Sequence, residues 1–191
     1  KAELNAMKQQ INPHFLFNSL NTLIDLIEDD QEKAVEFVRS FSNLYRIVLQ
    51  SSRHNLILLE DELAFLNYYW ELLKMRFNDT VELNIDLPEH FLTYMIPPLS
   101  LQLLVENAVK HNQFSRDRPL VLKIFSEEGA IKVTNELNPK VYEEHESGFG
   151  LQNLQKRFTS LISPITIEKG DKFFSVTLPV GQVANHKDLV D

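Results

Sequence analysis

The stretch IPPLSLQLLVENAVKHN, residues 96 to 112, predicts a helix that the pair Pro97-Pro98 opens and that runs to about Asn112. Asn107, Lys110 and His111 stand at positions i, i+3 and i+4, which are neighbours on a helix surface. An amide oxygen, an ammonium group and an imidazole on one face suit a magnesium-bound polyphosphate, since Mg²⁺ takes a few hard oxygen ligands. The same face also fits a solvated surface with an ion pair between Glu106 and Lys110, worth roughly a few tenths of a kcal/mol. The apolar residues recur on the other side, where they can face a sheet: Leu101, Leu104, Val105, Ala108 and Val109.

Strand signals stand on both sides of this helix. Apolar and polar residues alternate at 81–87, which is typical of a strand. A hairpin is expected around Gly170-Asp171, and a helix is expected to end near Leu161. From residue 79 to 181 we therefore expect an α+β sandwich with helices on one face of a mixed sheet. The predicted strands are residues 81–87, 120–126, 130–135, 165–168 and 173–178.

Residues 1–78 are expected to be helical, because they contain one proline, no glycine and apolar residues at helical spacing. The apolar stripes are more than a lone hairpin can cover, and a hairpin that dimerises into a bundle would bury them. The expected division is a helical dimerisation domain at 1–78, the sandwich domain at 79–181 and a disordered tail at 182–191. The predicted helices are residues 13–28, 31–50 and 58–77.

Composition limits the class of protein. The chain has 191 residues, a formal net charge of −8 and no cysteine. The negative charge argues against a nucleic-acid-binding protein, which normally has a basic face. The lack of cysteine excludes disulfides and thiolate metal sites, and it fits a reducing compartment. No apolar run is long enough to cross a bilayer. Because the first residue is lysine, we expect a cytoplasmic fragment of a longer chain, with a sensor or membrane segment upstream.

A histidine follows a proline in the stretch NPHFLFN, residues 12 to 18. Asn12 can cap a helix, and Pro13 suits its first turn. A neutral imidazole at His14 would be a competent nucleophile near neutral pH. Taken by itself, His14 is more simply a surface or capping histidine. In helical phase it heads a polar stripe that continues with Asn18, Asn21 and Asp25. A separate apolar stripe comprises Leu16, Leu20, Leu23 and Ile27.

Two glycines stand directly before the predicted helix that ends near Leu161. Gly148 and Gly150 in SGFGLQNLQKRF would let a backbone approach phosphate, and the start of a helix offers free amides. A lone G-x-G is more often only a turn. The polar, acidic stretch at 136–147, which we expect to be a mobile loop, and the Asn-Lys-His face before it favour the phosphate interpretation.

Four motifs occur in order along the chain: NPHFLFNSLN, LEDELAFLNYYWELLKMRF, IPPLSLQLLVENAVKHN and SGFGLQNLQKR. Together they resemble the LytS-type sensor histidine kinases over roughly residues 9–178. The resemblance implies that His14 accepts a phosphoryl group and that Asn107 binds Mg²⁺. It also implies that Gly148 and Gly150 cradle the phosphates of ATP in a domain of the GHKL type. The same two motifs of that domain contain further expected nucleotide-binding residues: Lys110, His111 and Leu151.

Two positions depart from the pattern of related proteins. Many GHKL proteins carry an Asp-x-Gly box after a strand, whereas this chain reads KVTNELNP with Asn135 at the corresponding place. An amide oxygen can still accept a hydrogen bond from the adenine amino group, without charge assistance. Many other histidine kinases place an acidic residue after the phosphoacceptor, but Phe15 follows His14 here. A base must therefore come from elsewhere, and Glu106 is the candidate, unless it only pairs with Lys110.

The leading interpretation is a homodimeric histidine kinase. It would phosphorylate His14 from Mg-ATP, and by resemblance it would pass the group to an aspartate on a response regulator, often of the LytTR type. A GHKL ATPase is a second interpretation, but such proteins place a water-activating glutamate one turn before the metal asparagine, where this chain has Leu103. A third is a degenerate, non-catalytic dimeric scaffold, supported only by Asn135 in the adenine box.

Overall fold

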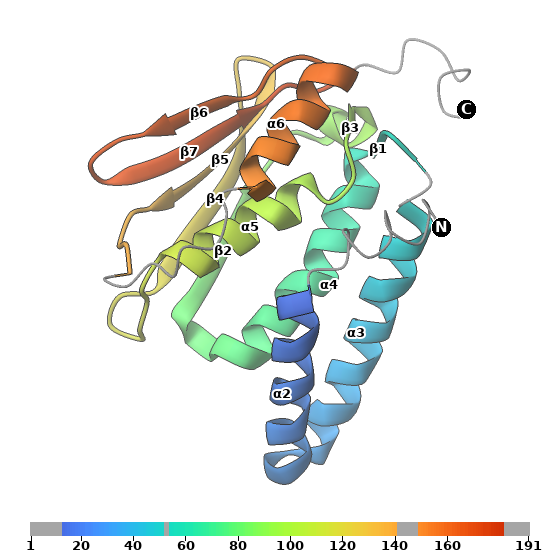
Figure 1. The fold of residues 1–191 in the computed structure, drawn as a ribbon, viewed down its shortest axis with the longest axis vertical. Helices are drawn as coiled ribbons and strands as arrows, with labels where there is room; N and C mark the ends of the chain where they lie inside the picture. The colour runs from blue at the N-terminus through green and yellow to red at the C-terminus, as the bar shows by residue number, and fades with distance from the viewer. Residues whose placement is uncertain (1–12, 52–53, 141–148, 182–191) are drawn as a thin grey trace.

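A computed structural model describes residues 13–51, 54–140 and 149–181 of the chain. Figure 1 shows two halves, one made of long helices and the other built on a sheet with helices on one face. The predicted α+β fold class is confirmed. The predicted tail at 182–191 and Gly148 lie outside the described residues.

The helical half follows the predicted pattern. Asp30 separates the first two helices, and its carboxylate accepts a hydrogen bond from the backbone N–H of Lys33 at 3.1 Å. This bond caps the second helix and lowers the pKa of Asp30. Phe37 and Leu44 of the second helix are buried in the core shared with the third. The three helices are α2 (Pro13–Asp29), α3 (Gln31–Ser51) and α4 (Leu59–Phe77).

Helix α4 is buried on more than one side. Leu59 and Leu66, which belong to its predicted apolar stripe, are fully buried. Phe65 and Tyr69 lie off that stripe, yet they are buried too. A helix that is buried on more than one side lies between partners, and α4 contacts both α3 and α5 (Ser100–His111). The domain division at residue 78 stays a prediction, because the helix that precedes it contacts both halves.

The sheet has five strands in the order β2-β4-β5-β7-β6. β2 pairs with β4 in parallel, and the remaining neighbours are antiparallel, so the sheet is mixed as expected. The tight turn between β4 and β5 places Glu128 and Gly129 at positive φ, 50° and 80°, which suits a hairpin. The strands are β2 (Val81–Asp86), β4 (Leu120–Glu127), β5 (Ala130–Glu136), β6 (Thr166–Lys169) and β7 (Phe173–Leu178).

Helices α5 and α6 (Phe149–Leu161) lie on one face of the sheet (Figure 1). The apolar side of α5 is buried as its periodicity predicts, except that Val109 is only half-buried. Leu154 and Phe158 of α6 complete the layer, and both are fully buried. This arrangement leaves the polar side of α5 directed away from the sheet.

Some elements differ from the prediction. Helix α5 begins at Ser100 rather than at the proline pair, because Leu99 adopts a left-handed conformation with φ 63°. A small antiparallel sheet joins β1 (Ile57–Leu58) to β3 (Met95–Ile96), and two short 3₁₀ helices, η1 (Asn78–Thr80) and η2 (Glu89–Thr93), flank β2. Elements of two to five residues have no periodicity that a sequence pattern could reveal.

Several large apolar side chains of α2 and α3 are exposed in the single chain. Leu20 and Ile27 of the predicted apolar stripe are 43% and 53% exposed, so the packing within one chain does not cover that stripe. The others of this group are Phe17, Ile24, Val35, Val38 and Leu49. Among the helices that the structure describes, none is both long and apolar enough to span a membrane.

Candidate active site

The polar face of α5 is accessible from outside the core. Asn107 and His111 are half-buried and Lys110 is exposed, whereas Leu104 and Ala108 on the opposite side are buried. The predicted segregation of the two faces is therefore confirmed. Lys110 and His111 each interact with another residue in the structure, so neither side chain is free.

The end of α5 is tied to the segment that follows β5. Asn112 is buried, and its side-chain amide donates to the carbonyl of Ala108 at 2.8 Å while its Oδ1 accepts the backbone N–H of Asn138 at 2.8 Å. The backbone N–H of Lys140 donates to the carbonyl of His111 at 3.2 Å. These bonds hold the segment that leads out of β5 against the polar face of α5.

Asn135 points toward the helical layer. It is buried together with Ile131 and Val133, which alternate with it along β5. Its Nδ2 donates to the carbonyl of Glu136 at 2.7 Å, which fixes the amide and leaves Oδ1 as the acceptor atom of the side chain. Asn135 therefore shares the buried face of β5 with Ile131 and Val133, and its role in binding adenine stays a prediction.

Gly150 lies in the first turn of α6, beside α5. A Cβ at this position would meet nothing nearer than Leu103 at 3.8 Å, which is an ordinary contact, and Gly150 has no positive φ. Packing against the described residues therefore does not require a glycine here. A glycine at this position lets a ligand approach the backbone closely. The neighbouring Leu151 is half-buried.

Glu62 of α4 is a buried carboxylate at the start of α5. Its Oε2 accepts the backbone N–H of Leu99 and its Oε1 accepts that of Leu101, both at 2.8 Å. These two bonds cap α5 and hold Leu99 in its left-handed conformation, which costs about 1–2 kcal/mol for a residue other than glycine. Burial raises the pKa of Glu62 to about 7, and the backbone amides and nearby Arg157 keep it from rising further.

Arg157 links α6 to the same point. Its guanidinium donates to the carbonyl of Pro98 at 2.8 Å. Burial lowers the pKa of Arg157, and the charge of Glu62 opposes that effect. Helices α4, α5 and α6 are therefore joined at the start of α5, which fixes the helix that carries Asn107 relative to the helix that carries Gly150.

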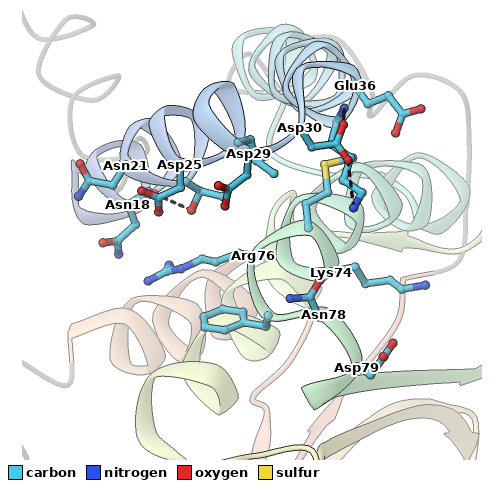
Figure 2. Close-up of a pocket in the computed structure, with 15 residues that line it drawn as sticks. Asn18, Asn21, Asp25, Asp29, Asp30, Glu36, Lys74, Arg76, Asn78 and Asp79 are labelled. Atoms are coloured by element: carbon cyan, nitrogen blue, oxygen red, sulfur yellow. Dashed lines mark hydrogen bonds and ion pairs between the residues drawn. The ribbon is translucent and has the colours of Figure 1, made fainter.

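A cleft of about 770 Å³ separates α2 from the end of α4 (Figure 2). One wall carries the polar stripe predicted for α2, namely Asn18, Asn21 and Asp25. The other wall includes Lys74 and Arg76. The backbone of His14 lies in the first turn of α2, at the head of that stripe, and its side chain lies outside what the structure describes. The stripe thus faces the end of α4 and not bulk solvent alone.

Arg76 of the cleft wall and two residues of α5, Glu106 and Lys110, affect the pKa values of the same neighbouring groups. Burial raises the pKa of the Tyr69 phenol, the charge of Glu106 raises it further, and Arg76 opposes both. Burial also lowers the pKa of Lys140, and Arg76 and Lys110 lower it further. Arg76 and Glu106 are therefore both near Tyr69, and Arg76 and Lys110 are both near Lys140.

Comparison with known proteins places the chain in a family. Residues 2–81 match the family described as "Histidine kinase". The chain is 31% identical over 176 residues to the "Sensor protein LytS" of Staphylococcus saprophyticus, covering 84% of this chain and 30% of that protein. It is 33% identical over 183 residues to the "Sensor protein LytS" of Bacillus cereus, covering 87% of this chain and 31% of that protein.

The chain belongs to the LytS-type sensor histidine kinases.

The match to the LytS relatives covers most of this chain but less than a third of each relative. The chain spans about 30% of the length of these LytS relatives. A histidine kinase of Acinetobacter baumannii, AdeS, is similar in structure with a TM-score of 0.44 and 14% sequence identity, covering 87% of this chain and 97% of that one. The family uses ATP, and the kinases of two-component systems dimerise and signal to response regulators.

For a LytS-type kinase, the sequence pattern predicted most of the candidate site residues. It did not identify the residues whose hydrogen bonds connect the helices and strands of the site. Glu62 lies within the acidic run LEDEL, where it looks like a solvated charge at the start of a helix. Asn112 and Arg157 resemble ordinary polar residues at helix ends and surfaces. Only Arg76 carried a signal that could have been used, because an arginine beside an aromatic residue at the end of a helix suits anion binding.

Proposed function

We propose that this chain is the catalytic core of a sensor histidine kinase that phosphorylates its own His14 from Mg-ATP. The observation that carries the proposal is the cleft, in which the stripe headed by His14 faces the end of α4, a helix that also contacts α5. A phosphoryl group bound at the polar face of α5 would then be separated from the helix that presents the nucleophile by the end of α4.

The nucleotide would occupy the space among α5, β5 and the start of α6. Asn107 would hold Mg²⁺ through its amide oxygen, and Mg²⁺ when bound would neutralise charge on the phosphate oxygens. Lys110 and His111 would contact the phosphates. Asn135 would accept a hydrogen bond from adenine through Oδ1. The phosphates would approach the backbone at the glycine turn, which comprises Gly148, Gly150 and Leu151.

The chemical step is a transfer to nitrogen. The lone pair of an imidazole nitrogen of His14 would form a bond to the γ-phosphorus, and the bond from that phosphorus to the β–γ bridging oxygen would break, releasing ADP. The proton on the other imidazole nitrogen would then pass to a base. We assign Glu106 as that base. The charge of Glu106 raises the pKa of the buried Tyr69 phenol, so its carboxylate lies near that phenol.

The phosphoryl group would next pass to a carboxylate of a partner. An aspartate oxygen of a response regulator would attack the phosphorus, the N–P bond would break, and His14 would regain its proton. We propose a regulator of the LytTR type as the partner, and an upstream sensor or membrane segment in the full-length protein.

The helical half would form a homodimer. Phe17 and Ile24 of α2 are 66% and 55% exposed, and burying such side chains contributes about 25 cal/mol per Å² of apolar surface. A second copy of α2 and α3 packed against the first would cover these side chains in a bundle. Residues 1–78 would then act as the dimerisation and phosphoacceptor domain and residues 79–181 as the ATP-binding domain.

One incubation with Mg²⁺ and γ-labelled ATP tests the proposal. Acid-labile label on the protein is expected. Release of inorganic phosphate without label would indicate an ATPase, and neither outcome would indicate a scaffold. His14→Ala should abolish labelling while Mg-ATP binding persists. Label that remained on another histidine, such as His54 or His111, would overturn the assignment of His14.

A further inference from the structure

We propose that Arg76 is a catalytic residue that binds the γ-phosphoryl group during its transfer to His14. The inference rests on the function proposed above and assigns one more residue to that reaction. It follows from where Arg76 lies and how its guanidinium is held.

Arg76 lies near the end of α4, the helix that faces α2 across the cleft and that contacts α5. It lines the cleft opposite the α2 stripe, and Figure 2 shows its side chain extended beneath Asn18 and Asp25. The end of α4 that carries Arg76 lies near the end of α5, because Phe77 packs against Phe114, three residues after His111, and α4 contacts α5. A group passing from the polar face of α5 to the first turn of α2 would come within reach of this side chain.

The guanidinium is held by aromatic rings and not by a carboxylate. It lies 4.7 Å from the centre of the Phe77 ring, and Phe77 packs edge-on against Phe114 at 5.2 Å. A cation over a ring face is attracted to it without using its N–H donors. Within the described residues, no ion pair ties Arg76 to a carboxylate. Its donors thus remain available for an anion.

The cleft that Arg76 lines carries both signs of charge: Lys33, Lys74 and Arg76 stand with Asp25, Asp29, Asp30, Glu36 and Asp79. Arg76 is therefore one of the few groups in the cleft that can attract an anion. A transferred phosphoryl group spreads negative charge over three oxygens, which the fork of a guanidinium matches.

Lys74 supplies a matched control. It lines the same cleft and is exposed, but it lies two residues earlier on α4 and so projects from a different side of the helix. In Figure 2 it extends away from the α2 stripe. General positive charge in the cleft would make Lys74 and Arg76 equivalent, whereas a specific contact would not.

The experiment compares Arg76→Ala, Arg76→Lys and Lys74→Ala with the wild-type chain. At saturating Mg-ATP, single-turnover labelling should slow about 100-fold or more in Arg76→Ala, as when one donor to a developing charge is removed. It should be intermediate in Arg76→Lys, which keeps the charge but not the fork. It should be unchanged in Lys74→Ala. Affinity for Mg-ATP and the melting temperature should change little.

A binding readout separates contact with the phosphoryl group from a loss of structure. Aluminium fluoride with Mg-ADP mimics the group in transfer, so it should tighten ADP binding by calorimetry in the wild type and not in Arg76→Ala. Equal tightening in both, no tightening in the wild type, or an equal loss of rate in Lys74→Ala would overturn the role of Arg76. If the wild type itself takes no label, the proposed function fails instead.

Discussion

Replacing Glu62 with glutamine should change how the stability of the protein depends on pH. The carboxyl has a pKa of about 7 in the folded chain against 4.5 as its ordinary value. Between these two values the folded state holds a proton that the unfolded state releases, so stability falls as pH rises. At about 1.4 kcal/mol per pH unit, the loss between pH 4.5 and pH 7 is about 3 kcal/mol.

The assay is urea unfolding followed by circular dichroism from pH 4.5 to pH 8, on the wild-type chain and on Glu62→Gln. Many groups titrate in this range, so the informative quantity is the difference in unfolding free energy between the two proteins at each pH. The wild type should lose about 3 kcal/mol relative to the variant as pH rises to 7, with no further relative change above that. Glu60→Gln, on the exposed side of the same turn, should follow the wild type.

Two results would refute this reasoning. A difference that stays constant with pH would mean that burial does not perturb Glu62. A wild type that gains stability relative to Glu62→Gln as pH rises would mean that the amides of Leu99 and Leu101, with Arg157, outweigh burial and hold the pKa below its ordinary value.

Three further predictions concern the nucleotide and the assembly. Asn107→Ala should remove Mg-dependent ATP binding with little change in melting temperature, and unchanged affinity by calorimetry would leave its helix face without a metal role. Asn135→Asp should raise the preference for ATP over GTP, because a charged acceptor is worth about 1 kcal/mol more than a neutral one. An unaltered ratio would show that Asn135 does not contact the base. Replacing both Phe17 and Ile24 with aspartate should turn a dimer into a monomer, as measured by sedimentation equilibrium. A wild type that is already monomeric at micromolar concentration would contradict the dimer.

The sequence predicted those parts of the fold that rest on long periodic segments. Helix α5 could be located, and its buried face named, because its apolar residues repeat over three turns. The pairing of β1 with β3 could not be predicted, since two-residue strands carry no period and their partners are distant in the chain. The burial of Glu62 could not be predicted for another reason. It depends on where the start of α5 packs, and an acidic residue in the first turn of a helix is ordinarily solvated.

Glu62 of α4 is hydrogen-bonded to the start of α5, and the end of α4 beside Arg76 packs near the end of α5 through Phe77 and Phe114. The length of α4 therefore sets the distance between these two points. The 14 positions from Glu62 to Arg76 span about 21 Å of helix, and each residue turns the helix by about 100°. Inserting or deleting one residue between them would rotate Arg76 away from the cleft, while Glu62 would keep its hydrogen bonds to the start of α5. The length of this interval should therefore be held fixed among working relatives even where its side chains vary, and one alanine inserted after Asn67 would break the register while keeping the helix.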